Sequence, residues 1–312
     1  MSLSGGLDGA PHPTPDDEPQ DWKDIVMRGG SLRQVDLEQG VNGWASPPGH
    51  LFHVRGPQYF AKRLKIPSGD WLLKPLGVDW LKSTAKLDHV LARSDNRVMD
   101  ALYKAHENGY GLKSFIFAVN LQVPGREHRS CVFYYVAEDP IPHGSLLYRF
   151  IHEDDSFRNS RFKLINRIVR GPWIVRATVG NHAACLLGKA LTCHYLKGPN
   201  YLEIDVDIGS STVANYILHL ALGYVNSVAV DMAFLVESQS DDELPERLLG
   251  AVRISQIEME SAVSVDSRTD RDNARPLNNS VVTSSPGPPG WFSLLSHCKK
   301  TGKVEDEQIQ RY

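Results

Sequence analysis

The chain has few cysteines and no long apolar run. Its four cysteines (Cys131, Cys185, Cys193 and Cys298) form no CxxC pair, so neither a disulfide scaffold nor a zinc site built on such pairs is expected. No segment approaches the roughly 20 apolar residues that span a bilayer, and residues 1–21 lack the apolar stretch of a secretory signal. These absences predict a cytoplasmic protein that meets membranes peripherally, if at all.

Catalytic signatures are also missing. The patterns GxSxG, HExxH, GxxxxGK[ST] and GxGxxG do not occur. The twelve histidines are scattered, and His194 next to Cys193 would point to the opposite face of a strand. The sequence therefore predicts no catalytic residue, no metal site and no cofactor.

Acidic residues are absent from positions 156–202, although the whole chain has a net charge of −3. Without a global positive field, nucleic acid is not an expected partner. The acid-free segment contains eight cations, and Arg158, Arg161 and Lys163 alternate with Phe157 and Phe162. Basic residues beside aromatic ones suit a phosphate or an anionic membrane. The predicted headgroup-binding residues are Arg158, Arg161, Lys163, Arg167 and Arg170. The alternative is charge balance with the acids at 153–155 and 203–207.

The middle of the chain predicts a single α+β domain. Residues 1–21 and 261–312 are rich in Gly, Pro, Ser and Asp, which predicts disordered tails around a domain at 22–260. Strands are expected at 114–123 and 130–137 as a hairpin, and at 173–179, 190–196, 201–208, 228–237 and 249–258. Helices are expected at 95–108 and 145–152. Short turns between most strands favour a curved, mainly antiparallel sheet.

Residues 212–225 predict a long helix that is apolar on nearly all sides. Such a helix is typically buried, so we expect the sheet to wrap around it. The alternative is that Tyr216, Leu220 and Tyr224 line an apolar ligand pocket. The preceding turn, Gly209, Ser210 and Ser211, has free N–H groups that suit an anion, or serines that simply cap the helix.

Three acids precede this turn. Alternation along the strand places Glu203, Asp205 and Asp207 on one face and Leu202, Ile204 and Val206 on the other. A salt-bridged or solvated strand face is the preferred interpretation. A hard-cation site and the acid–base pair of a hydrolase are the alternatives.

The C-terminal segment WFSLLSHCKK, residues 291–300, combines aromatic and aliphatic side chains with two lysines. This composition suits contact with a membrane interface, and Cys298 is a candidate for palmitoylation. The alternatives are a strip that docks on the domain and a disordered tail.

Signatures distributed from about residue 43 to 257 carry a family resemblance. They read GWASPPGHLFHVRGPQYFAKRLKIPSG, FAVNLQVPG, FRNSRFKLINRIVRGPW, LLGKALTCHYLKGPNYLEIDVDIGSS, VDMAFLVE and ELPERLLGAVR. In order and spacing they resemble the C-terminal domain of the plant Enhanced Disease Resistance 2 family. Longer family members resemble multi-domain proteins in which a pleckstrin-homology domain and a START domain come first, and targeting by such modules is not expected here.

The resemblance implies lipid-associated regulation of defence and programmed cell death, and it supplies no catalytic residue. The leading hypothesis is a non-enzymatic lipid-binding or membrane-associated regulatory module, with an anionic lipid, a membrane surface or a protein as partner. A ligand-free protein-interaction scaffold and a hydrolase that uses the strand acids are the alternatives.

Overall fold

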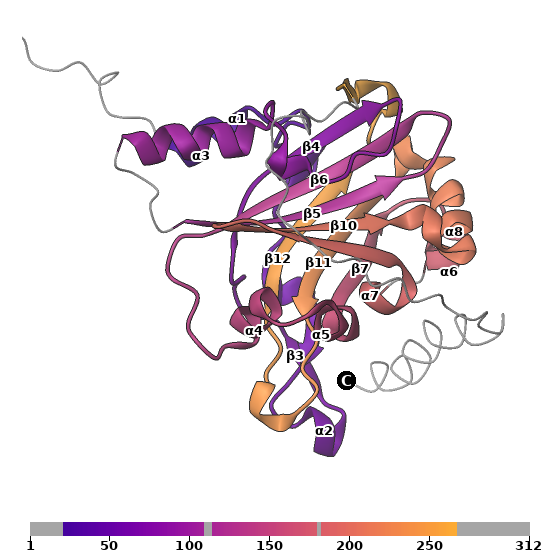
Figure 1. Ribbon diagram of the computed structural model, residues 1–312. Coiled ribbons are helices and arrows are strands. Elements are labelled where there is room, and N and C mark those ends of the chain that lie inside the picture. Colours follow the sequence, from indigo (N-terminus) through magenta and orange to yellow (C-terminus); the bar gives the residue numbers. More distant parts are fainter. Residues whose placement is uncertain (1–20, 109–113, 180–181, 267–312) are drawn as a thin grey trace, which may run out of the picture.

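A computed structural model describes residues 21–108, 114–179 and 182–266. The predicted tails, apart from their inner ends at 21 and 261–266, and the whole WFSLLSHCKK segment lie outside the described residues. The described chain folds into two packed β-sheets with short helices around them (Figure 1). This confirms the α+β class and the mainly antiparallel pairing.

The larger sheet has six strands. Its order is β13 (Val263–Ser264), β4 (Lys74–Ser83), β6 (His128–Ala137), β5 (Phe115–Val123), β10 (Tyr201–Asp207) and β9 (Thr192–Lys197). The β5–β6 hairpin confirms the prediction, and β9 pairs antiparallel with β10. β10 is parallel to β5, and β13 is parallel to β4.

The second sheet has five strands, all joined antiparallel. Its order is β1 (Gly43–Ala45), β12 (Leu248–Ser255), β11 (Ala229–Val236), β7 (Phe162–Arg170) and β8 (His182–Leu186). A separate hairpin pairs β2 (His53–Arg55) with β3 (Lys65–Pro67). This hairpin covers the outer face of the five-stranded sheet, where Phe52 and Val54 pack with Ile165 and Leu235.

The main core lies between the two sheets. Phe234 of β11 packs against Phe133 of β6, with ring centroids 5.7 Å apart, and stacks on Phe162 of β7 at 6.0 Å. Inward residues of β10, Leu202, Ile204 and Val206, belong to the same cluster. Thus the predicted alternation along residues 201–208 is confirmed, but the core is filled by a second sheet and not by a helix.

The helices lie around the sheets. They are α1 (Trp22–Arg28), α2 (Tyr59–Lys62), α3 (Arg97–Glu107), α4 (Leu146–His152), α5 (Asp155–Arg161), α6 (Trp173–Val179), α7 (Leu187–Ala190) and α8 (Thr212–Leu222). α1 and α3 cover the outer face of the six-stranded sheet (Figure 1). β6 is therefore buried on both faces, which explains its unbroken apolar run SCVFYYVA.

Short 3-10 turns complete the connections. They are η1 (Gly49–Leu51), η2 (Val90–Ala92), η3 (Ile208–Ser210), η4 (Val225–Ser227), η5 (Asp241–Glu243) and η6 (Met259–Ser261). The η2 turn lies over the outer face of β10, where it contributes Val90 and Leu91 to the cluster beneath α3.

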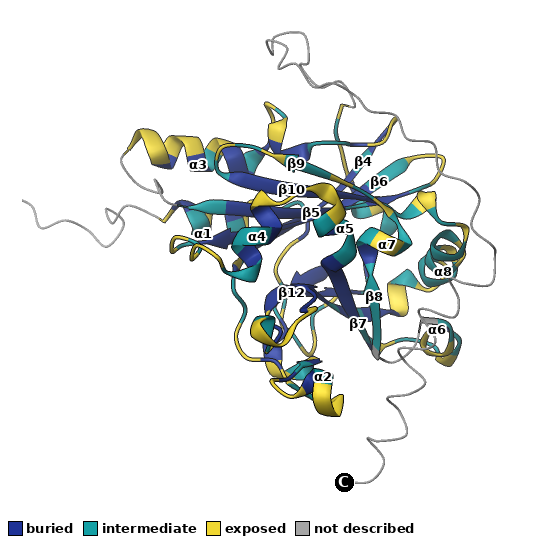
Figure 2. Cartoon of the chain, turned by 60° about the horizontal axis from the view of Figure 1, so that its bottom comes forward, coloured by how far each residue is buried: buried dark blue, intermediate teal, exposed yellow. Residues whose placement is uncertain are grey.

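The predicted long buried helix is corrected by the structure. α8 ends at Leu222, and none of its residues is buried; in Figure 2 it is teal and yellow, whereas the strands are largely dark blue. One side, with Leu218 and Leu222, packs against the core. The residues that point outward are Thr212, Tyr216 and His219, so the high apolar content of the helix did not signify burial here.

The strand predicted at 173–179 is also wrong, because these residues form helix α6. Pro172 precedes the helix, and its carbonyl accepts hydrogen bonds from the N–H groups of Val175 and Arg176. Proline is well suited to a helix start, and this local signal outweighs the β propensity of Ile174 and Val175. Regular structure also continues past residue 260, since β13 pairs with β4.

Gly250 of β12 lies directly against the ring of Tyr135 of β6. A Cβ placed on it would lie 2.3 Å from Cε1 of Tyr135. We expect Gly250→Ala to lower the free energy of unfolding by about 1–3 kcal/mol, because the extra methyl group must displace a buried ring. Gly69→Ala is the matched control, since no atom lies within 4 Å of its added Cβ. Urea titration measures both; equal midpoints for the two variants would contradict this packing.

Candidate functional site

A pocket of about 530 Å³ opens at one end of the two sheets. It lies where the end of β6 faces the end of β11 and the start of β12, with the 138–147 segment closing one side. Its apolar lining is Leu72, Leu73, Val136, Ile141, Leu146, Leu147, Val236 and Leu249. Several of these residues also belong to the main core, so the pocket leads directly into it. The volume is that of a small-molecule site, typically about 300–1,000 Å³.

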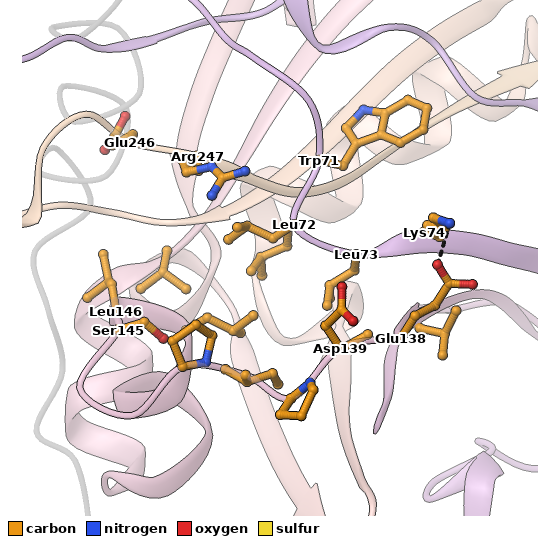
Figure 3. Close-up of a pocket in the computed structure, with 18 of the residues that line it drawn as sticks. Trp71, Leu72, Leu73, Lys74, Glu138, Asp139, Ser145, Leu146, Glu246 and Arg247 are labelled. Atoms are coloured by element: carbon orange, nitrogen blue, oxygen red, sulfur yellow. Dashed lines mark ion pairs between the residues drawn. The ribbon is translucent and has the colours of Figure 1, made fainter. Parts of the chain in front are cut away.

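Figure 3 shows how the walls are arranged. Leu72 and Arg247 lie on one side, and Ser145 and Leu146 at the start of α4 lie on another. Ser145 caps α4, since its side chain accepts a hydrogen bond from the N–H of Tyr148 at 3.1 Å. The cap fixes the helix start, and with it the position of Leu146 against the pocket.

Most charges at the pocket are already neutralised. Glu138 accepts hydrogen bonds from Lys23, at 2.5 Å, and forms an ion pair with Lys74. These two contacts lower the pKa of Glu138, with the Lys23 hydrogen bond as the largest cause. Asp139 and Arg247 also line the pocket, and neither makes an ion pair within the described chain.

Trp71 adds one unused donor. Its indole N–H is a buried group with no acceptor in the part of the chain that the structure describes. A buried donor without a partner is costly, and a ligand acceptor or a water satisfies it. The lining thus combines an apolar wall with one available cation, one available acid and one available N–H.

A charge network includes two residues of the pocket lining, Glu243 and Glu246. Glu246, with a fully buried side chain, accepts from the backbone N–H of Arg55 at 2.9 Å and from Lys163 Nζ at 3.3 Å. Glu237 pairs with Lys163 at 3.2 Å and with Arg55 at 3.0 Å. This network joins β2, β7, β11 and the 238–247 segment.

Glu243 extends the network to α4 and α5. It pairs with Arg161 at 2.6 Å and with Arg149 at 2.8 Å. Burial acts to raise the pKa of Glu243, but hydrogen bonds from Arg161, the N–H of Gln239 and Arg149 lower it below its ordinary value. The carboxylate therefore stays ionised and holds the two helices to the η5 turn.

The predicted headgroup residues are engaged inside the protein. Arg158, Arg161 and Lys163 are all buried. Arg158 donates to the carbonyls of Phe150 and Ile151 and pairs with Asp155. These three cations are thus used to hold the strands and helices together, as the charge-balance alternative expects.

Arg167 and Arg170 extend the segment toward its end. Arg167 pairs with the buried Asp231 at 2.5 Å. Arg170 is exposed and reaches only neutral acceptors, Gln256 and the carbonyl of Glu38. A headgroup role for the five cations stays a prediction. Except for Asp155, their carboxylate partners are not the acids at 153–155 and 203–207 that the sequence suggested.

The strand acids have a structural role. Glu203 and Asp205 are fully buried, so the predicted solvated or salt-bridged face is wrong for these two. Glu203 accepts from the N–H groups of Val90 and Leu91, at 2.6 and 2.7 Å, and Asp205 accepts from the N–H of His89 at 2.9 Å. Asp207 alone follows the expectation, through an ion pair with Lys86 at 2.8 Å.

Burial raises the pKa of Glu203 well above its ordinary value, and the charge of Asp205 and the hydrogen bond between the two carboxyl groups act in the same direction. Burial also raises the pKa of Asp205. A proton shared between them limits the repulsion of two buried carboxylates. The pair anchors the η2 turn, and its full burial keeps substrates away, which removes the basis for a hydrolase centred on it.

The residues predicted to line a pocket are on the surface instead. Tyr216 and Tyr224 are exposed, and Leu220 is half-buried. Neither they nor the turn before α8 contribute to the pocket described above. In that turn Ser211 caps α8 by accepting from Ala214 N, and Ser210 donates to the carbonyl of Asp207. The capping alternative therefore holds for Ser211, and Gly209 lies within η3.

Within 21–108, 114–179 and 182–266, no three His, Cys, Asp or Glu side chains come together in an arrangement able to hold a metal ion. Over the same ranges, no helix has both the length and the hydrophobicity needed to traverse a bilayer.

The pocket and the glutamate network were missed by sequence reasoning. The available signal was the acid-rich stretch at 237–246, E-S-Q-S-D-D-E-L-P-E, in a chain whose basic segment has no acids of its own. Opposite charges concentrated in two separate segments indicate that the segments meet. The pocket itself depends on the gap between two sheets, which no local pattern encodes.

Comparison with known proteins agrees with the resemblance noted in the sequence. The family model described as Protein ENHANCED DISEASE RESISTANCE 2, C-terminal, matches residues 44–258. A curated protein of Arabidopsis thaliana named Protein ENHANCED DISEASE RESISTANCE 2-like is 48% identical over 240 residues, which is 77% of this chain and 32% of that protein. The chain therefore spans about a third of the length of this relative.

Proposed function

We propose that this chain, which belongs to the Protein ENHANCED DISEASE RESISTANCE 2 C-terminal family, is a non-enzymatic module that binds a lipid and thereby regulates plant defence. The regulatory part rests on the name of the Arabidopsis relative, which refers to disease resistance. The lipid-binding part rests on one observation, the apolar pocket of about 530 Å³ that leads into the core between the sheets.

The lining suggests how a lipid would be held. An acyl chain would lie against Leu72, Leu146 and Leu249, because these side chains offer a continuous apolar wall. A phosphate or carboxylate of the head would meet Arg247, the cation of the lining that the described chain leaves unpaired. Asp139 provides the complementary charge for an amine in a zwitterionic head.

Binding of a fluorescent lysophosphatidylcholine tests this proposal. We expect Leu146→Trp to weaken binding roughly tenfold or more, because the larger ring occupies the acyl-chain space. Arg247→Ala should weaken it about tenfold through loss of a charged hydrogen bond. A labelled lysophosphatidic acid keeps the phosphate but lacks the cationic group of the head. Its affinity therefore reports the contact with Arg247 without the contribution of Asp139.

Ile25→Trp is the matched control, since it adds the same ring at an exposed site on α1. It should bind like the wild type, and circular dichroism should show all variants folded. No saturable binding by the wild type, or equal affinity for wild type and Leu146→Trp, would overturn the proposed site.

A further inference from the structure

Only one side of helix α8 packs against the protein. Leu218 and Leu222 contact the main core. At 3.6 residues per turn, Tyr216 and Leu220 fall on the opposite side, and Tyr224 follows just after the helix ends. Tyr216 is 69% exposed and Tyr224 is 40% exposed, and Leu220 belongs to no core cluster of the described residues. The exposed side of α8 therefore presents Tyr216 together with the polar Thr212 and His219, and Leu220 is half-buried beside it.

Helix α6 lies beside α8 and extends this surface, as Figures 1 and 2 both show. Its buried residue Val175 packs with Ile168 and Val228, which attaches the helix to the five-stranded sheet. Trp173, at the start of α6, is 78% exposed. An indole ring that is so exposed is unusual, because it forgoes a large burial energy.

The charge of this surface has one sign. Residues 156–202 and 208–230 contain no Asp or Glu, so neither helix nor its flanks contribute a carboxylate. Arg176 of α6 is exposed, and its guanidinium makes no hydrogen bond or ion pair within the described ranges. Arg170, just before α6, is exposed and meets only neutral acceptors. Arg170 and Arg176 therefore remain available to an external anion, although the net charge of the whole chain is −3.

We infer that Trp173, Arg176, Tyr216, Leu220 and Tyr224, here called the α6–α8 surface, dock on an anionic lipid bilayer. Tryptophan and tyrosine are the residues that settle at headgroup level, with an apolar ring below and a polar edge in water. Arginines beside them are attracted to anionic lipids, and the absence of carboxylates from α6 and α8 limits the opposing repulsion. This surface is separate from the pocket and does not rest on the proposed ligand.

Co-sedimentation of the full chain with vesicles tests the inference. The wild type should bind vesicles of phosphatidylcholine mixed with phosphatidylserine, and bind phosphatidylcholine vesicles more weakly. Trp173→Ser combined with Tyr216→Ser should lower the partition coefficient roughly tenfold or more, and Arg176→Glu about tenfold, with a loss of salt dependence. All three side chains are exposed, so these variants should fold.

Tyr103→Ser is the matched control, because it removes another exposed aromatic ring, from α3. It should sediment like the wild type, and so should the pocket variant Leu146→Trp. Failure of the wild type to bind the mixed vesicles, or unchanged binding by the double variant, would overturn the inference. So would a wild-type dimer that the double variant dissociates, since this result would make the surface a contact between two copies of the chain.

Discussion

Asp231→Ala is expected to lower the free energy of unfolding by about 3–5 kcal/mol. Asp231 is fully buried in β11 and lies directly between Arg167 of β7 and Arg253 of β12 in the strand register. It pairs with Arg167 at 2.5 Å and with Arg253 at 2.6 Å. Its removal takes the shared carboxylate from two guanidinium groups, and Arg253 keeps only the longer ion pair with the exposed Glu38, at 3.5 Å. This loss of a buried counter-charge is the physical cause of the destabilisation.

Chemical denaturation of Asp231→Ala and Asp100→Ala measures the effect. Asp100 makes an exposed ion pair with Lys104 within α3, so its removal should change the midpoint very little. An Asp231→Ala midpoint close to that of the wild type would show that Arg167 is not a structural cation. The sequence-based headgroup role would then regain its support.

The pH dependence of stability should be altered by Glu203→Gln. Because burial raises the pKa of Glu203 above its ordinary value of 4.5, the folded state holds a proton that the unfolded state releases. The stability from this proton is fully present below pH 4.5. It falls by about 1.4 kcal/mol per pH unit as the pH rises from 4.5 through the raised pKa.

The difference in unfolding free energy between wild type and Glu203→Gln isolates this effect, because glutamine does not titrate. It should move in favour of the variant as the pH rises above 4.5. Glu260→Gln is the control, since Glu260 is largely exposed, and its difference from the wild type should stay nearly constant. A constant difference for Glu203→Gln as well would contradict a shared proton between Glu203 and Asp205.

Local patterns predicted the strands well where both faces of a sheet are covered. The continuous apolar run of β6 and the alternation of Leu202, Ile204 and Val206 both identify strands correctly. The strand β7 was not predicted, because its sequence FKLINRIVR places Lys163, Arg167 and Arg170 in a strand that also supplies core residues. Only the acids of β11 and the 237–246 stretch, distant in sequence, make such a strand stable.

For helix α8, the sequence predicted burial that the structure does not show. Its composition predicted burial because a helix that is apolar on all sides usually lies in a core. In the structure, Leu218 and Leu222 are packed while Tyr216 and Tyr224 face outward. An apolar side reserved for an external partner has the same sequence pattern as one reserved for the core, so composition cannot separate the two.

The measurement that tests the central claim most directly is the intact mass of the full chain under non-denaturing conditions, after purification from plant cells. The account predicts a bound phospholipid on the wild type and on Ile25→Trp, identified by extraction, and its loss from Leu146→Trp. A ligand-free mass for the wild type, or the same lipid retained by Leu146→Trp, would contradict a lipid site at the end of the two sheets.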